Sequence, residues 1–206
     1  MTIYQDIRSI SPGLSARDLL RHLIVERFPS QTIVTASLKA PSLVVLKMVA
    51  DIDPVTPVAF CRRGFQFPES RAYRERIVDL LGLENITETA GGEAEVLPGD
   101  IDHSERMWSE TEDGMARSYE ICHLNRTLAP YDCWISAVYH LPRSPHIEQR
   151  VDVESRLIRV DPLLRWSRDD VRVFMREHEL PFHPRAIRRR PEPPAESQPL
   201  PPTYHF

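Results

Sequence analysis

The chain contains few cysteines, and their spacing excludes several kinds of site. Only Cys61, Cys122 and Cys133 occur in 206 residues, and none forms the C-x-x-C pair typical of zinc, iron–sulfur or dithiol sites. Their odd number favours a reducing compartment over a disulfide framework. We therefore expect no metal ion, no iron–sulfur cluster and no other cofactor.

Long apolar runs and an excess of positive charge are also missing. No stretch of about 18 apolar residues occurs, and the N-terminal MTIYQDIRS has neither the basic start nor the apolar segment of a secretory signal. The formal net charge is −4, which argues against a membrane surface or a nucleic acid as the partner. The sequence thus predicts a cytoplasmic protein.

The segments that are present alternate between strand and helix patterns. The β-branched run QTIVTAS precedes the apolar PSLVVLKMVADI, and PVAF precedes PESRAYRERIVDLLGL, which Gly82 closes. Further strands are expected at NITET and YDCWISAVY, with an edge strand near RLIRV, and further helices at SARDLLRHLIVERF, MARSYEICHLNRTLA and WSRDDVRVFMREHEL. This alternation predicts an α/β fold of three layers: a mostly parallel twisted sheet with helices on both faces.

The end of the chain has a different composition. Arg185 and Arg188 to Arg190 form a basic cluster, and the proline-rich PEPPAESQPLPP follows it. Such a segment cannot bury enough apolar surface to fold, so we expect it to be disordered. The predicted organisation is one α/β domain over residues 1–184 and a flexible tail over residues 185–206.

Two loops fall where a parallel sheet binds ligands, beyond the carboxyl ends of its strands. SLKAPS follows the first strand and precedes a helix, whose first N–H groups favour an anion. CRRGFQF follows the second strand, and each of its arginines can form a bidentate hydrogen bond with a phosphate or a carboxylate. Adjacent residues of an extended segment face opposite ways, so at most one of Arg62 and Arg63 is expected to line the pocket.

Four segments in a fixed order resemble the phosphoadenylyl-sulfate and adenylyl-sulfate reductases, part of the adenine nucleotide alpha-hydrolase-like superfamily. They are SLKAPSLVVLKMV, VAFCRRGFQFPESRAYRERIVDLLGL, YDCWISAV and VDPLLRWSRDDVRVFMREHELPFHP, within residues 11–184. The most specific parts are FPES with its tyrosine-bearing helix and LLGL, and the last block, which is similar to the family's NPL-x-x-W-x-x-x-DV…LPYHP element. The resemblance implies that the chain binds an adenine nucleotide or sulfonucleotide.

The resemblance also assigns residues to the nucleotide site. The family's S-F-G-x-x-S loop falls on residues 37–42, where both serines match and a lysine replaces the glycine. Its L-D-T-G loop falls on residues 61–64, where two arginines replace the acid and the threonine. The family carries several arginines after its WI(T/S)G strand, and in this sequence Arg143 is the one counterpart. The implied nucleotide-binding residues are Ser37, Lys39, Ser42, Arg62, Arg63, Gly64 and Arg143.

The family's reaction uses a cysteine for which this sequence has no obvious counterpart. A thiolate attacks the sulfur of the sulfonucleotide and forms a thiosulfonate on the enzyme, which thioredoxin then resolves. That cysteine lies in a Glu-Cys-Gly-Leu-His ending, and no cysteine follows Cys133 here. Cys61, beside the two arginines, is either a substitute nucleophile or a packed core residue, and the catalytic residue stays unassigned.

Three hypotheses remain for the function. The first is a reductase relative that binds an adenine nucleotide in sulfur metabolism, with a thioredoxin-like or subunit partner that supplies a thiol. The second is a non-catalytic relative that acts as a regulatory or assembly subunit, with the proline-rich tail as a docking segment. The third is an ATP-dependent adenylating enzyme of the same superfamily, against which the missing loop glycine counts. In each case we expect a homo-oligomer.

Overall fold

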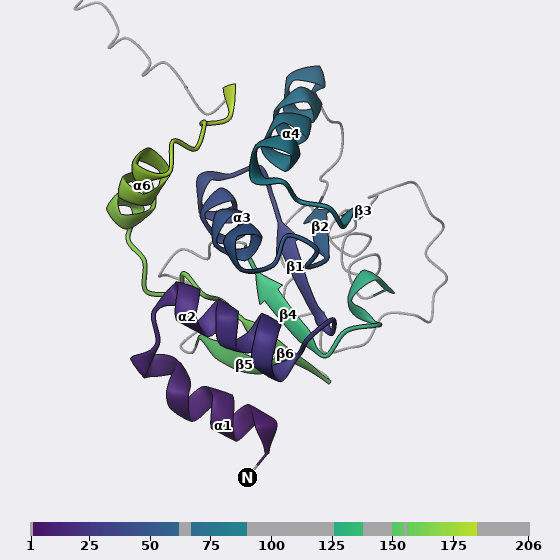
Figure 1. Cartoon of the computed structure of the whole chain (residues 1–206), viewed down its shortest axis with the longest axis vertical. Coiled ribbons are helices and arrows are strands. Elements are labelled where there is room, and N and C mark those ends of the chain that lie inside the picture. Colours follow the sequence, from purple (N-terminus) through teal and green to yellow (C-terminus); the bar gives the residue numbers. More distant parts are fainter. Residues whose placement is uncertain (1, 62–66, 90–125, 138–149, 155, 185–206) are drawn as a thin grey trace, which may run out of the picture.

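A six-stranded sheet forms the centre of the protein. The structure, a computed structural model, describes residues 2–61, 67–89, 126–137, 150–154 and 156–184 (Figure 1). The strand order is β3-β2-β1-β4-β6-β5, and every neighbouring pair is parallel except β5 with β6. The predicted mostly parallel α/β fold is confirmed. The strands are β1 (Thr32–Ala36), β2 (Val58–Cys61), β3 (Ile86–Thr89), β4 (Cys133–Ser136), β5 (Val151–Glu154) and β6 (Leu157–Val160).

The helices begin and end largely where their capping residues predict. Ser167 forms a capping box with Asp170, and Gly82 ends its helix at a φ of 64°, a conformation that glycine adopts readily. Past Arg21 the backbone widens, and Phe28 N–H donates to Leu23 O at 2.8 Å. The helices are α1 (Ile3–Ile10), α2 (Ala16–Arg21), α3 (Ala40–Ile52), α4 (Pro68–Leu81) and α6 (Arg168–Glu177), with a 3₁₀ turn at Ser11–Gly13 and a π-helix at His22–Arg27.

Three elements, β5, β6 and α1, differ from the sequence prediction. The strand expected at the sheet edge, β6, lies between β4 and β5, and the edge strand is β5. β5 lacks an apolar run, since only Val151 is buried while Asp152 and Val153 are exposed. Helix α1 was not predicted because Ile7 is its only buried residue. The predicted helix at MARSYEICHLNRTLA and the tail at 185–206 lie mostly or wholly outside the described residues.

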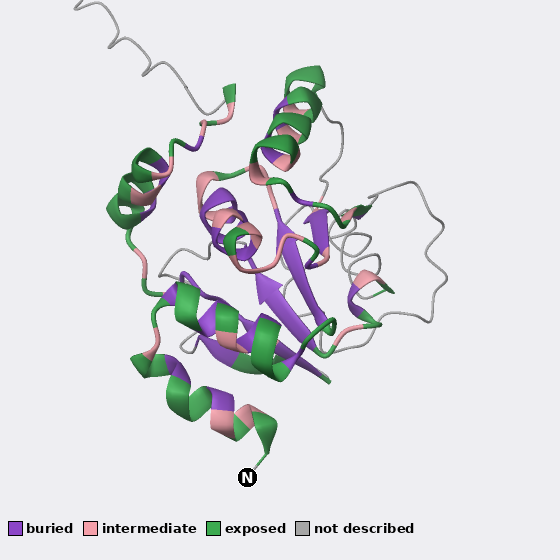
Figure 2. Cartoon of the chain, viewed as in Figure 1, coloured by how far each residue is buried: buried purple, intermediate pink, exposed green. Residues whose placement is uncertain are grey.

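The central strands β1, β2 and β4 consist almost entirely of buried residues (Figure 2), and their apolar side chains, which alternate between the two faces of the sheet, belong to two hydrophobic clusters. On one face, α3 contacts α2, α4 and α6 and buries almost all of its apolar side chains. On the other face, Trp134 and its neighbours join Leu128, from the short helical turn before β4. The central strands are therefore enclosed, and their carboxyl ends are fixed in place.

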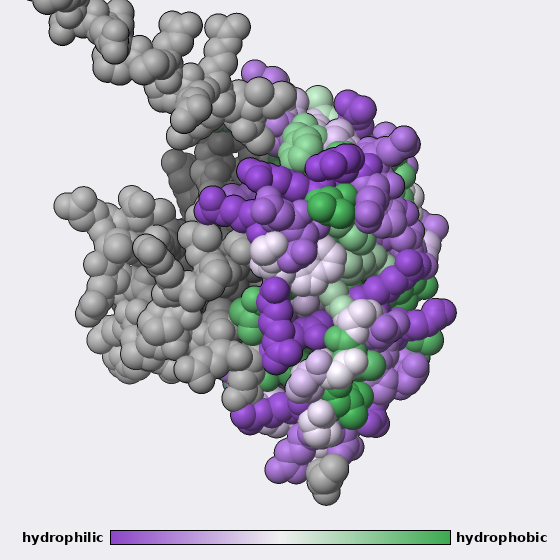
Figure 3. All heavy atoms as spheres, turned by 90° about the vertical axis from the view of Figure 1, so that its left-hand side faces the viewer, coloured by the Kyte–Doolittle hydropathy of each residue, from purple (hydrophilic) through white to green (hydrophobic). Residues whose placement is uncertain are grey.

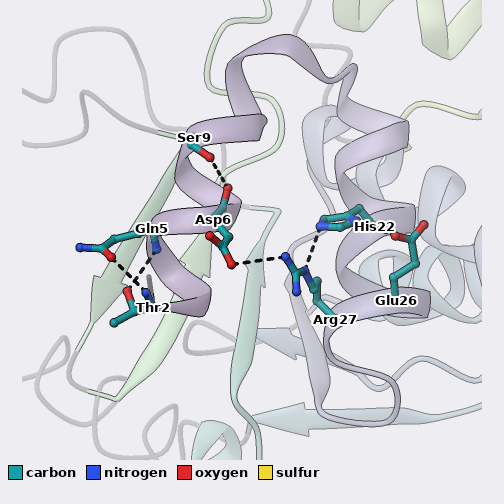
Figure 4. A network of polar contacts seen from close by, with 7 residues as sticks. All are labelled: Thr2, Gln5, Asp6, Ser9, His22, Glu26 and Arg27. Carbon is teal, nitrogen blue, oxygen red and sulfur yellow. Dashed lines mark hydrogen bonds and ion pairs between the residues drawn. The ribbon is translucent and has the colours of Figure 1, made fainter.

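Polar contacts join the N-terminal helices to each other and to the sheet. Arg27 of the π-helix lies 3.7 Å from the Asp6 carboxylate of α1 and donates to His22 Nε2 at 3.3 Å (Figure 4). Arg150, at the start of β5, is buried and donates through Nη1 to the carbonyls of Ser11 and Leu14 at 3.0 and 2.9 Å. These contacts hold α1 and α2 on the β5 side of the sheet.

The outer surface is mainly polar where it can be seen. On the face turned toward the viewer in Figure 3, apolar residues form small separate groups among hydrophilic ones. Within the described ranges, no helix combines the length and the apolar character needed to cross a bilayer.

Candidate functional site at the carboxyl edge of the sheet

The carboxyl ends of five parallel strands lie at one edge of the sheet. The order in which the chain adds strands to the sheet reverses between β1 and β4. From β1 the strands proceed through β2 to β3 on one side, whereas β4 and β6 lie on the other side. A crevice at such a reversal is the usual ligand site of an open parallel sheet. The loop that follows β1 and the residue just past β4, Ala137, therefore flank the candidate site.

Hydrogen bonds close the loop between β1 and α3 and connect it to β4. Ser37 N–H donates to Ser42 Oγ at 3.0 Å, and the two serine hydroxyls lie 2.9 Å apart. Lys39 N–H lies 3.4 Å from Ser37 Oγ. The Ser42 hydroxyl donates to the carbonyl of Ala137, just past β4, at 2.8 Å. The predicted pair of serines thus meets directly, at the point where the strand order reverses.

Helix α3 begins at this loop without a capping side chain. Its N-cap residue is Lys39, whose side chain makes no capping hydrogen bond, and Pro41 has no N–H to offer. Among the described residues, the N–H groups of Ala40 and Ser42 have no acceptor. The positive end of the helix dipole and these donors favour an anion, and the exposed Lys39 ammonium adds a charge nearby.

The structure places three of the predicted nucleotide-binding residues. Ser37 is half-buried, Lys39 is exposed, and Ser42 is 1% exposed. The other predicted residues, Arg62, Arg63, Gly64 and Arg143, lie outside the described residues, so their place in the site stays a prediction. In the sequence, Arg62, Arg63 and Gly64 follow directly after Cys61 of β2, and Arg143 comes six positions after Ala137.

Sequence reasoning missed a polar cluster that crosses three strands. Asp161, directly after β6, is buried, and its carboxylate lies 3.3 Å from Arg159 Nε. The Arg159 guanidinium lies 5.2 Å from the centre of the Trp134 ring, and the Trp134 indole N–H donates to Thr35 Oγ1 at 2.8 Å. The only sequence signal was the aspartate of DPL, where the family's element has asparagine.

Burial dominates the electrostatics of this cluster. It raises the pKa of the Asp161 carboxyl, although the Arg159 guanidinium and the Ser136 hydroxyl act in the opposite sense. Asp161 N–H also donates to the carbonyl of Arg150 at 2.9 Å. The cluster therefore connects the end of β6 to β4 and to the start of β5, and so stabilises the carboxyl edge of the sheet.

A second missed feature connects α4 to the chain beyond α6. The Tyr73 hydroxyl donates to the carbonyl of Pro181 at 2.7 Å, and His183 Nε2 lies 3.1 Å from Ser70 Oγ. The Tyr73 and His183 rings meet edge to face, with their centroids 4.8 Å apart. Burial raises the pKa of the Tyr73 phenol to about 12, and Arg76 opposes that shift.

Comparison with known proteins decides the family. The profile of the phosphoadenosine phosphosulfate reductase domain matches residues 31–185, a range that runs from the start of β1 past His183. The chain belongs to the phosphoadenosine phosphosulfate reductase family. The resemblance inferred from the sequence is therefore confirmed, and with it an assignment to proteins of sulfur metabolism.

Individual relatives agree with this assignment. An adenosine 5′-phosphosulfate reductase from Mesorhizobium japonicum is 28% identical over 172 residues, which cover 83% of this chain and 67% of that protein. A phosphoadenosine 5′-phosphosulfate reductase from Gloeobacter violaceus is 25% identical over 164 residues, which cover 78% of this chain and 67% of that protein.

Solved structures share the fold. The phosphoadenylyl-sulfate reductase from Candida auris, crystallised as a phosphate complex, aligns with a TM-score of 0.61 and 16% identity over 89% of this chain and 91% of that chain. The U34-tRNA thiolase NcsA from Methanococcus maripaludis, which carries a 4Fe-4S cluster, aligns with a TM-score of 0.53 and 12% identity over 87% of this chain and 65% of that chain.

The thiols of this reductase-family chain differ in their surroundings. Cys133 is buried in β4, and burial raises the pKa of its thiol to about 12, so it stays protonated at neutral pH. Cys61 is half-buried at the carboxyl end of β2, on the candidate site's edge, and forms no disulfide. Cys122 lies outside the described residues. Of the two described thiols, only Cys61 has a position suited to chemistry at this edge.

Metal ligands do not gather in the part of the chain that the structure describes. No group of three His, Cys, Asp or Glu side chains there is arranged to hold a metal ion. The expectation of no metal and no iron–sulfur cluster stays a prediction.

Proposed function

We propose that this chain binds an adenine nucleotide carrying a phosphate or sulfate group, at the edge where β1 and β4 diverge. The observation that carries the proposal is the start of α3 at that point, which no side chain caps: the N–H of the half-buried Ala40 has no acceptor among the described residues, and the exposed Lys39 lies beside it. The relatives' names supply the ligand class, since they are reductases of adenosine phosphosulfates.

The remaining predicted residues complete the proposed site. Lys39 contacts a phosphate as a point charge, whereas Arg62, Arg63 or Arg143 forks onto a second phosphate or the sulfate. Gly64 lets the backbone approach the ligand closely. Because Arg62 and Arg63 replace an acid and a threonine after β2, this loop favours a negatively charged group of the ligand.

Calorimetric titration tests the proposed binding. Adenosine 3′,5′-bisphosphate, adenylyl sulfate, ATP and uncharged adenosine are compared with the wild-type chain, and the charged nucleotides are expected to bind more tightly. Lys39→Ala is expected to remove one anion contact, and one of Arg62→Ala and Arg63→Ala is expected to remove another; a lost contact costs about 1.5–3 kcal/mol, or about 10- to 150-fold in affinity. The control is Arg172→Ala, whose side chain pairs with Asp169 on the exposed face of α6.

The titration has one result that rejects the site. If none of the charged nucleotides binds, or if all bind no better than adenosine, the assignment of an anion-binding nucleotide site is wrong. Equal loss of affinity in Arg172→Ala and Lys39→Ala would indicate a general charge effect and would also reject it.

Reductase chemistry at this site requires a thiol, and two sources fit the proposal. Either the Cys61 thiolate attacks the sulfur of the bound sulfonucleotide, which breaks the sulfur–oxygen bond, releases the adenosine phosphate and leaves a thiosulfonate on the cysteine, or a thiol of a thioredoxin-like partner or second subunit does so. Sulfite release from adenylyl sulfate and from phosphoadenylyl sulfate, measured with reduced thioredoxin, separates these sources. Loss of activity in Cys61→Ser indicates the first source, and activity that persists in Cys61→Ser indicates the second.

The non-catalytic alternative is favoured by the inert thiol of Cys133, which leaves a single described thiol at the edge. Tight nucleotide binding without sulfite release would identify a regulatory or assembly subunit. ATP turnover would identify the adenylating alternative instead. The cytoplasmic location and the homo-oligomer stay predictions, and light scattering on the purified chain measures the oligomeric state.

A further inference from the structure

We propose that Ser42 is a positioning residue: its hydroxyl fixes the nucleotide-binding loop in its anion-accepting shape and makes no contact with the ligand. The inference rests on the proposed function and deepens it, because the sequence pattern alone places Ser42 among the residues that touch the nucleotide. It follows from the directions of four hydrogen bonds.

The direction of each bond can be worked out from the single hydrogen on each hydroxyl. The Ser42 hydroxyl lies 2.8 Å from the Ala137 carbonyl, which only accepts, so its hydrogen points there. Ser42 Oγ must then accept from Ser37 N–H at 3.0 Å, and also from the Ser37 hydroxyl at 2.9 Å. Ser37 Oγ is left to accept from Lys39 N–H. The result is a one-way chain from Lys39 through Ser37 and Ser42 to Ala137.

These hydrogen bonds use the full hydrogen-bonding capacity of the Ser42 hydroxyl. A serine hydroxyl donates once and accepts twice, and all three places are occupied by groups of the protein itself. The side chain is also 1% exposed. A ligand therefore has neither a free lone pair nor an approach to this hydroxyl.

The same chain decides which backbone donors face the ligand. The N–H groups of Ser37 and Lys39 are engaged in these hydrogen bonds, whereas the N–H of the half-buried Ala40 keeps no acceptor among the described residues. The same hydrogen bonds also tie the loop after β1 to Ala137, across the point where the strand order reverses. One hydroxyl thus sets the shape of the loop and its position relative to β4.

The test compares Ser42→Ala with a matched loss of a buried hydroxyl elsewhere. Thr32→Val is the control, because the Thr32 hydroxyl is equally buried and donates to the Phe28 carbonyl at 3.0 Å, at the opposite end of β1. The probe is adenosine 3′,5′-bisphosphate, titrated by calorimetry into each folded variant. We expect Ser42→Ala to weaken binding by about tenfold or more and Thr32→Val by less than about twofold.

Two further measurements distinguish positioning from contact. Amide hydrogen exchange, followed by NMR without ligand, should show Ser37 and Lys39 losing protection in Ser42→Ala but not in Thr32→Val. Ser37→Ala interrupts the same chain on a half-buried side chain, so the double variant should bind little more weakly than Ser42→Ala alone.

Each outcome has a defined meaning. Unchanged exchange at Ser37 and Lys39 in Ser42→Ala overturns the inference, whether or not binding falls, and so do fully additive effects of the two serine variants. If the wild-type protein binds no bisphosphate, the proposed function fails. The exchange measurement still tests the series of hydrogen bonds from Lys39 to Ala137. If Ser42→Ala does not fold, exchange in Ser37→Ala decides, with loss of protection at Lys39 as the expected result.

Discussion

The hydroxyl of Tyr73 should stabilise the fold by a small and measurable amount. Tyr73→Phe keeps the buried ring and removes the 2.7 Å hydrogen bond to the Pro181 carbonyl. The loss of one neutral hydrogen bond costs about 0.5–1.5 kcal/mol, which for a chain of this size lowers Tm by roughly 2–4 °C per kcal/mol. Tyr73→Ala also removes the ring and its edge contact with His183, and should cost about 3–5 kcal/mol.

The pH dependence of this effect follows from the Tyr73 pKa. The folded value, about 12, lies above the ordinary value of 10.0, so folding favours the protonated phenol. The stabilisation is therefore fully present below pH 10 and is lost as the pH rises toward 12. The difference in unfolding free energy between wild type and Tyr73→Phe should stay constant from about pH 6 to pH 9.

Urea unfolding at several pH values, followed by tryptophan fluorescence, measures this difference. Tyr4→Phe is the control, because the Tyr4 hydroxyl only accepts from Arg8 on the exposed side of α1, and its loss should change stability by less than about 0.5 kcal/mol. A Tyr73→Phe difference that stays constant as the pH rises from 10 toward 12 would refute the argument, since the phenol would then titrate in the folded protein as it does in water.

Three other predictions concern single residues. Iodoacetamide should modify Cys61 in the native protein and Cys133 only after unfolding, as read by peptide mass mapping, because burial raises the pKa of the Cys133 thiol to about 12. The raised pKa of Asp161 makes its contribution most favourable at acidic pH, so the stability of Asp161→Asn relative to wild type should increase as urea unfolding is repeated from about pH 4 to pH 7. Gly82→Ala should cost about 1 kcal/mol, from the φ of 64° alone, because no atom lies within 4 Å of the new Cβ; Glu179→Gly, at a φ of 51°, should have the opposite sign.

Contrary results would be equally specific. Rapid native labelling of Cys133 would mean that β4 opens readily in solution. An Asp161→Asn variant that loses stability as the pH rises would show that the Arg159 ion pair outweighs burial. A cost well above the strain expected for Gly82→Ala would mean that the helix end requires more than backbone freedom.

The parts of the fold that could be predicted are those whose stabilisation is local. β1 and α3 have dense apolar runs, and Ser167 and Gly82 supply capping signals within a few residues of the helix ends. β5 could not be predicted, because its place comes from pairing with β6 and not from its own residues.

The candidate site also has features that could be predicted from the sequence and features that could not. Ser37 and Ser42 could be assigned to the site from the resemblance to the family's loop, whereas the direction of their hydroxyls depends on Ala137, nearly a hundred residues away. The contact of Arg159 with Trp134 depends on the register in which β6 meets β4, where these two residues are opposite each other. Such long-range registers leave no periodic signal in one sequence.

The joint between α4 and the segment after α6 has a consequence for how such sequences diverge. Ser70 and Tyr73 belong to FPES and its helix, and Pro181 and His183 belong to LPFHP, the two stretches that most clearly carry the family resemblance. In space the two stretches are in direct contact, so we expect a substitution in one to affect the other. A lineage that loses the tyrosine should drift in the histidine as well, and the paired substitution should appear more often than either change alone.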